Sequence, residues 1–203
     1  MGANIEIKAR VENFSEFKAI VEKLSQTPVT LLVQEDTFFN TPHGRLKLRV
    51  LVPDKAELIF YQRSDSSGPK RSDYLITGTT SPLALKAVLT AAYGIRGVVR
   101  KQRLLYSIGP TRIHLDQVED LGTFVELEVV LESDQSDHEG RTLAADLMTQ
   151  LRIQEKDLIK EAYIDLLESQ TEYSNVYSPE RIDCSPIRRA GLKPAPTMKN
   201  KNG

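Results

Sequence analysis

The stretch that decides the fold is the opening segment Asn4-Ile-Glu-Ile-Lys-Ala-Arg10, in which polar and apolar residues alternate. In a β-strand successive side chains point to opposite faces, so this alternation separates an apolar face from a charged one. Ile5, Ile7 and Ala9 form the apolar face, and the other face carries one carboxylate and two cations. The segment therefore predicts a strand that buries one face and needs a polar environment for the other.

Four later segments repeat this alternation of charged residues, at 45–49, 101–103, 112–116 and 126–128. A single segment of this kind is typical of a solvated sheet surface. Five of them have a second explanation, a closed barrel with a polar interior whose apolar outer faces pack against helices. The pattern thus indicates an α+β protein built on a barrel.

Length and composition set the other limits. The 203 residues suffice for one substantial core, so we expect one domain over 1–170 and a flexible tail over 171–203, which is rich in proline and poor in large apolar residues. The formal net charge of −1 argues against a nucleic-acid partner, and the single cysteine excludes a disulfide within the chain. No apolar run approaches the ~18–20 residues that span a bilayer, so we expect a cytoplasmic protein without a membrane partner.

Periodicity and turn residues give the order of the elements. Asn13 caps a first helix, and Ser81-Pro82 begins a second that stops at Gly94. Two further helices are expected over about 136–151 and 155–168. The expected strands after the first cover 29–40, 45–51, 57–63, 71–77, 98–108, 111–117 and 123–131. Short strands joined by tight turns indicate antiparallel pairing.

Cations are the most frequent charged residues on these alternating faces. If they share one lumen, they repel one another unless a polyanion neutralises them, and arginine and lysine both suit phosphate oxygens. The prediction is a ligand with several phosphates, although solvated strand faces stay an alternative. The candidate phosphate-binding residues are Lys8, Arg10, Arg45, Lys47, Arg49, Arg63, Arg71, Lys101, Arg103 and Arg112.

Carboxylates share the same faces. Glu126 and Glu128 lie on one strand face, roughly 6.6 Å apart along the backbone. Such oxygen ligands fit Mg²⁺ or Mn²⁺, and metal with cations is what phosphoryl or nucleotidyl transfer needs. Simple pairing with neighbouring arginines is an equally weighted alternative. His114 shares the inferred inward face, where a structural role is favoured over proton transfer, and His43 is expected at the surface.

Several motifs together resemble the CYTH superfamily, also called triphosphate tunnel metalloenzymes, and within it the class IV adenylyl cyclases. The similarity covers about residues 3–168 in order. The opening is similar to the family's Glu-x-Glu-x-Lys signature, and Gly44–Arg49 to its second signature. The motifs that resemble the cyclase branch are Arg63-Ser-Asp65, Ser72-Asp73-Tyr74, Arg100-Lys-Gln-Arg103, Tyr106, His114-Leu-Asp116, Leu121-Gly122, Phe124 and Glu126.

The resemblance implies an antiparallel, eight-stranded tunnel that binds a nucleoside or inorganic triphosphate. Glu6, Glu126 and Glu128, helped by Asp116, would hold metal, and the cations already named would hold phosphates. Lys8, Lys101 and Arg103 would be the catalytic cations. Asn4 departs from the family, because it stands where the first glutamate is expected, and an amide oxygen brings no negative charge to the metal.

Three functions follow as hypotheses. The first is a cyclase-like enzyme that converts ATP to cyclic AMP and pyrophosphate, and the second is hydrolysis of an inorganic or organic triphosphate in the same tunnel. The third is a protein that binds polyphosphate or nucleotide without turnover, which is motivated by Asn4. A symmetric homodimer is an open alternative to a monomer, because many small domains form such dimers.

Overall fold

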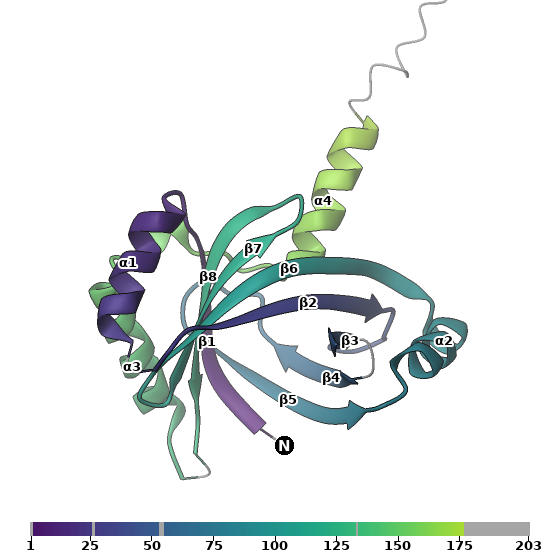
Figure 1. Ribbon diagram of the computed structural model, residues 1–203, viewed down its shortest axis with the longest axis horizontal. Coiled ribbons are helices and arrows are strands. Elements are labelled where there is room, and N and C mark those ends of the chain that lie inside the picture. The colour runs from purple at the N-terminus through teal and green to yellow at the C-terminus, as the bar shows by residue number, and fades with distance from the viewer. Residues whose placement is uncertain (1, 26, 53–54, 133, 177–203) are drawn as a thin grey trace, which may run out of the picture.

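Eight antiparallel strands close into a barrel in the computed structural model, which describes residues 2–25, 27–52, 55–132 and 134–176. Each strand pairs with two neighbours, and β1 closes the barrel between β5 and β8. The predicted α+β barrel is therefore confirmed (Figure 1). In barrel order the strands are β1 (Gly2–Arg10), β5 (Lys70–Thr79), β4 (Lys55–Arg63), β3 (Arg45–Val52), β2 (Thr30–Phe39), β6 (Ile95–Ile108), β7 (Thr111–Val118) and β8 (Gly122–Val130).

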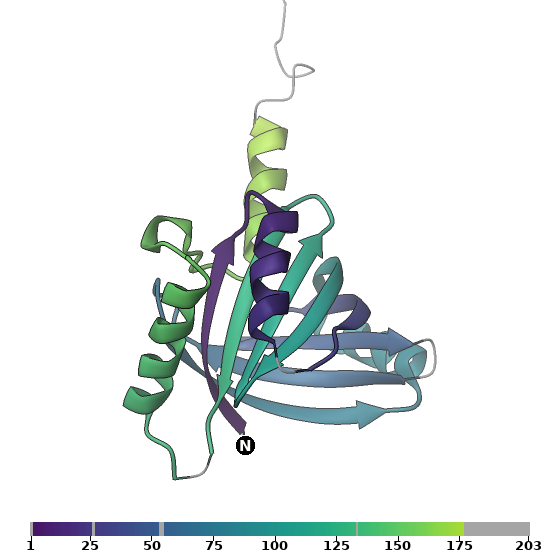
Figure 2. The ribbon, with the colours of Figure 1, turned by 60° about the vertical axis from the view of Figure 1, so that its left-hand side comes forward.

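The outer face of one half of the barrel is covered by α1 (Phe14–Leu24) and α3 (Asp137–Gln150), which both lie at the left of Figure 1 and come forward in Figure 2. Ile7 and Ala9 of β1 pack there with Val21 of α1 and Leu147 of α3. The apolar face of the opening strand thus points outward to helices, and its polar face points into the barrel. Burying such apolar surface is the main favourable contribution to folding.

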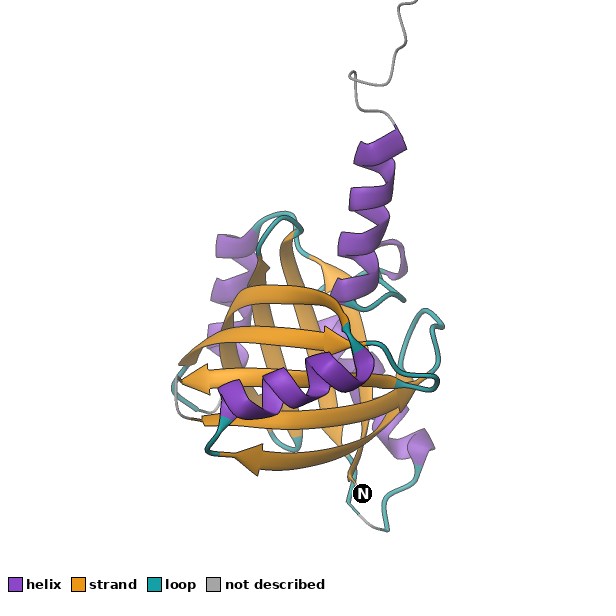
Figure 3. Cartoon of the chain, turned by 90° about the vertical axis from the view of Figure 1, so that its right-hand side faces the viewer, coloured by secondary structure: helices purple, strands orange, loops and turns teal. Residues whose placement is uncertain are grey.

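The other half of the barrel carries α2 (Pro82–Tyr93), which crosses the outside of the strands in Figure 3. Leu85 and Leu89 of α2 pack on Phe39 and Leu48, from β2 and β3.

Asn13, before α1, accepts a hydrogen bond from the backbone N–H of Glu16 at 3.2 Å, as expected of a helix cap. No helix among residues 2–25, 27–52, 55–132 and 134–176 is both long and apolar enough to cross a membrane.

The expected helix over 155–168 is wrong in its first half. Glu155–Asp157 forms only a 3₁₀ turn, and the chain then runs beside β1, where the N–H of Ile159 donates to the carbonyl of Lys8 at 2.8 Å. Backbone pairing with the barrel replaces helical hydrogen bonds there. Helix α4 (Tyr163–Val176) begins later and includes the first six residues of the predicted tail, and positions 177–203 lie outside the described residues.

Candidate functional site: a charged tunnel inside the barrel

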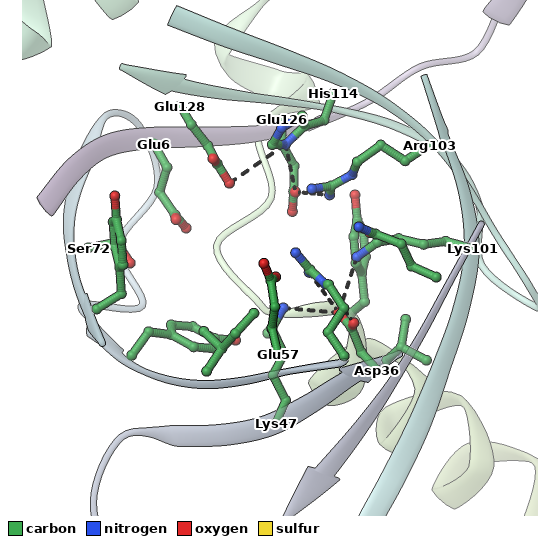
Figure 4. Close-up of a pocket in the computed structure, with 18 of the residues that line it drawn as sticks. Glu6, Asp36, Lys47, Glu57, Ser72, Lys101, Arg103, His114, Glu126 and Glu128 are labelled. Atoms are coloured by element: carbon green, nitrogen blue, oxygen red, sulfur yellow. Dashed lines mark hydrogen bonds and ion pairs between the residues drawn. The ribbon is translucent and has the colours of Figure 1, made fainter. Parts of the chain in front are cut away.

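A cavity of about 370 Å³ lies inside the barrel and is lined by residues from all eight strands (Figure 4). Such a volume is in the range of small-molecule sites. Most of the residues predicted from sequence line it, because they occupy the inward positions of their strands. The predicted residues in the lining are Glu6, Lys8, Lys47, Arg49, Arg63, Lys101, Arg103, Arg112, Glu126 and Glu128.

Carboxylates gather on the wall formed by β1, β7 and β8, which we call the acidic wall. Strand register places Glu6 opposite Glu128, and Glu126 opposite both Lys8 and His114. His114 Nδ1 lies 3.8 Å from Glu126 and 3.6 Å from Glu128. Sequence reasoning favoured a structural role for His114, whereas the structure brings its ring to the two carboxylates.

Glu126 is the most strongly paired of these carboxylates. It lies 3.2 Å from Lys8 Nζ and 2.5 Å from Arg103 Nη2. Burial alone raises the pKa of Glu126, but the charges of Lys8 and Arg103 outweigh it and hold this pKa well below its usual range. Glu126 is therefore ionised at neutral pH.

Glu6 has a different environment. Its carboxylate pairs with Arg63 at 3.2 Å. Burial raises the pKa of Glu6, and the negative charges of Glu126 and Glu128 add to the rise, against the lowering effect of Arg63. Adding a cation to this wall would relieve that repulsion.

Asp116 lies behind the cavity wall. It is 0% exposed, receives two hydrogen bonds from Arg103 at 2.7 and 2.6 Å, and accepts one from the hydroxyl of Tyr163 at 2.9 Å. Its carboxylate thus orients Arg103, which also reaches Glu126. The metal-ligating role of Asp116 stays a prediction. In this structure its carboxylate is hydrogen-bonded to Arg103 and Tyr163.

Cations dominate the wall formed by β2, β3 and β6, which we call the basic wall. Their centre is Asp36, which sequence reasoning did not single out and which is 1% exposed. It accepts hydrogen bonds from Lys47 at 3.0 Å, from Arg49 at 2.8 and 2.9 Å, and from Lys101 at 3.4 Å. Gln34 and Asp36 lie two residues apart and both line the cavity, so the alternation of polar residues in this strand could have predicted the position of Asp36.

Charge crowding perturbs the basic wall. Burial, reinforced by the positive charges of Arg49 and Lys101, lowers the pKa of Lys47 to about 7, although Asp36 opposes the shift. The Asp36 carboxylate itself stays ionised, because Arg49, Lys47 and Lys101 overcome the cost of its burial and hold its pKa well below the usual range.

One end of the tunnel is crossed by the segment 160–163. Lys8 donates to the carbonyl of Glu161 at 3.1 Å, and Arg63 and Lys70 both donate to the carbonyl of Lys160 at 3.1 Å. The Lys8 ammonium also lies 3.8 Å from the ring centre of Tyr163. Sequence reasoning missed this closed end, because the segment was assigned to a helix.

Three predicted cations lie elsewhere. Arg10 ends β1, is exposed, and donates to the carbonyl of Leu121 at 3.1 Å. Arg45 pairs with Asp165 at 2.8 Å and with Asp65 at 3.1 Å. Arg71 points outward, because its neighbour Ser72 lines the cavity, and it pairs with acids on the surface. None of the three belongs to the described cavity lining.

A metal fits the acidic wall by the chemistry of its donors. One atom from each of His114, Glu126 and Glu128 can be chosen so that all three lie within 4.8 Å of one another. Asn4 lines the same cavity, and its buried amide oxygen has no hydrogen-bond partner within the part of the chain that the structure describes. Two carboxylates, an imidazole and an amide oxygen are suitable ligands for a divalent cation.

Comparison with solved structures gives the same barrel. The PH1012 protein of Pyrococcus horikoshii OT3 matches with a TM-score of 0.72 and 25% identity, over 80% of this chain and 98% of that one. A putative adenylate cyclase from Vibrio parahaemolyticus matches with a TM-score of 0.68 and 20% identity, over 81% and 97%. A putative adenylyl cyclase from Hippeastrum, described as having a dominant triphosphatase activity, matches with 0.59 and 13%, over 84% and 96%.

Sequence comparison identifies the family, although no curated protein matches this chain. The sequence model of the CYTH domain matches residues 2–163, which is most of the chain. The resemblance found in the opening motif and the basic strand is thereby confirmed. This chain belongs to the CYTH domain family.

Proposed function

We propose that this chain is a Mg²⁺- or Mn²⁺-dependent enzyme that acts on a nucleoside triphosphate, with cyclisation of ATP to cyclic AMP and pyrophosphate as its reaction. The observation that carries the proposal is the division of one cavity into an acidic wall and a basic wall (Figure 4). A triphosphate alone would be repelled by the carboxylates, whereas a metal–triphosphate complex complements both walls.

The cations would bind the phosphates. Lys8 and Arg63 lie toward the closed end, and Lys101 and Arg103 lie along the side of the cavity. Arg49, Lys47 and Arg112 complete the set, whereas Arg10 and Arg45 would contribute only from outside the described lining. During cyclisation these cations would stabilise the charge that develops on pyrophosphate, and we assign Lys8, Lys101 and Arg103 to that role.

Residue order along the strands supports attack at the α-phosphorus. Lys8 contacts the closed end, and Glu6 and Asn4 follow it toward the other end of the tunnel. That other end carries apolar Leu32, Leu51, Ile76 and Leu105, which suit an organic group such as a nucleobase. A nucleotide with its base there would extend its terminal phosphate to Lys8 and leave its α-phosphate near the layer of Glu6.

The chemistry then needs few parts. The ribose 3′-oxygen forms a bond to the α-phosphorus, its proton is released to water, and the bond from that phosphorus to pyrophosphate breaks. A metal held by Glu6, Glu126 and Glu128 would polarise the phosphate oxygens and favour ionisation of the hydroxyl. The chain itself supplies orientation, which is a large part of the rate enhancement in such reactions.

Two other functions have specific support. Hydrolysis of a triphosphate would use the same cations, and the cluster of Lys8, Arg63 and the basic wall near the closed end suits a terminal phosphate. Binding without turnover is favoured by Asn4, because an amide in place of a carboxylate weakens the hold on a metal.

Product analysis separates these functions. Purified protein is incubated with ATP, or with tripolyphosphate, in Mg²⁺ or Mn²⁺, and the products are resolved by ion chromatography. We expect cyclic AMP and pyrophosphate in equal amounts from ATP. Orthophosphate with ADP, or orthophosphate from tripolyphosphate, would mean that the enzyme hydrolyses its substrate and does not cyclise it. Binding seen by calorimetry without any product would mean that the protein binds its ligand without turnover.

A further inference from the structure

The acidic wall contains a buried nitrogen atom without a hydrogen-bond partner among the described residues. His114 lies on β7 and is only 5% exposed, and this atom is its Nδ1. The carboxylates of Glu126 and Glu128 lie 3.8 and 3.6 Å from this nitrogen, which is too long for a hydrogen bond. Leaving a buried polar atom unpaired is unfavourable, so such an atom points to a bound ion or water.

The spacing suits a metal better than a proton. Two ligands on opposite sides of a Mg²⁺-sized ion at about 2.1 Å lie about 4.2 Å apart, and adjacent ligands lie closer. The separations of His114 Nδ1 from the two glutamates fall inside that range. One ion between the three side chains would satisfy the nitrogen and both carboxylates at once.

The imidazole is placed as a ligand. His114 lines the cavity together with Glu126 and Glu128, and one atom from each of these three side chains lies within 4.8 Å of the others. Both carboxylates also pair with cations of the wall, at 2.5 to 3.3 Å, so a metal would share them with these cations.

We propose that His114 Nδ1 is a metal ligand, together with Glu126 and Glu128, so that the ion has a mixed nitrogen and oxygen shell. This inference rests on the proposed function only in that a divalent cation binds the acidic wall. Asn4 then loses its importance, because the imidazole supplies the donor that the missing carboxylate would have provided. Since imidazole suits transition metals and Mg²⁺ strongly prefers oxygen, the site should favour Mn²⁺ over Mg²⁺.

Electron paramagnetic resonance of Mn²⁺ tests the inference without any turnover. We expect electron spin echo modulation from a directly bound ¹⁴N nucleus in the Mn²⁺-loaded protein, replaced by a ¹⁵N signal when the protein is grown on ¹⁵N-histidine. The modulation should disappear in His114→Gln, with Mn²⁺ affinity falling about tenfold or more. It should persist in His43→Gln, the matched change at an exposed turn.

Each result decides the matter. Bound Mn²⁺ without nitrogen modulation in the unmodified protein would overturn the role of His114 and leave the proposed function standing. Modulation that survives in His114→Gln would do the same. Failure of the protein to bind Mn²⁺ at all would overturn both. Because ¹⁵N-histidine labels all three histidines, persistence of the ¹⁵N signal in both His43→Gln and His138→Gln assigns it to His114 even where His114→Gln does not fold.

Discussion

The two walls of the tunnel both bury charged side chains, and they differ in how these charges are paired. In the basic wall, one carboxylate, Asp36 of β2, accepts hydrogen bonds from three cations on the two adjoining strands, β3 and β6. In the acidic wall, one donor atom each from His114, Glu126 and Glu128 lie within 4.8 Å of one another, and His114 and Asn4 each have a buried polar atom without a hydrogen-bond partner in the described part of the chain. The carboxylate at the centre of the basic wall is therefore fully paired. Each glutamate of the acidic wall also pairs with a cation, but that wall still has two buried polar atoms that a metal would satisfy. This difference indicates that a metal binds at the acidic wall, and that phosphates at the basic wall compete with Asp36 for its cations.

Arg103 connects the two walls, and its loss should have the largest effect. In Arg103→Met the carboxylate of Asp116 would stay fully buried with Tyr163 as its only hydrogen-bond donor among the described residues, and Glu126 would lose its shortest ion pair. Breaking a buried pair in this way costs about 3–5 kcal/mol. We expect the free energy of unfolding in urea to fall by about that amount.

Arg100→Met is the matched control for this change. Arg100 lies on the same strand but points outward, is 55% exposed, and pairs with Glu35 at 3.1 Å. Exposed pairs contribute less than about 1 kcal/mol, so this variant should unfold near the unmodified protein. Equal losses in both variants would mean that Arg103 does not hold the walls together.

The sequence predicted the tunnel well where strands are long and regular. Alternation in β1, β3 and β8 placed Lys8, Lys47, Arg49, Glu126 and Glu128 on inward faces, and each lines the cavity. Period 2 is a property of the strand itself, so it needs no knowledge of the partners. The same argument failed at strand ends, where Arg10 has the parity of Lys8 but lies beyond the cavity lining.

Features that depend on contacts across the barrel could not be predicted in this way. The closed end uses a segment, 160–163, whose apolar spacing resembles a helix and whose role comes from hydrogen bonds to β1, β4 and β5. Asp36 was passed over because its significance arises only when β2 lies between β3 and β6. Asp116 has the predicted parity, yet Arg103 and Tyr163 hold it behind the wall.

Asp36→Asn tests whether the basic wall competes with phosphate. The change keeps the shape of the side chain but removes the charge that neutralises three cations, so we expect tripolyphosphate to bind about tenfold more tightly by calorimetry, which is ~1.4 kcal/mol. Glu57→Gln is the matched control, because Glu57 also lines the cavity but belongs to none of the hydrogen bonds around Asp36. Unchanged or weaker binding in Asp36→Asn would show that Asp36 orients the cations rather than competing with the ligand.

The smallest expected effect is the uptake of a proton by the basic wall when a polyanion binds. The pKa of Lys47 is lowered to about 7, so at pH 8 most molecules of the free protein have a neutral Lys47. A bound polyanion favours the charged form and raises this pKa, so the complex holds more protons than the free protein, and affinity should fall as pH rises above 7. Calorimetry of tripolyphosphate binding at pH 8, in buffers of different ionisation enthalpy, should therefore show close to one proton more taken up by the unmodified protein than by Lys47→Gln. Lys86→Gln, on the outer helix α2, should match the unmodified protein. Equal uptake in Lys47→Gln would mean that the titrating group lies outside the basic wall, and the contrast between the two walls would then not extend to their protonation.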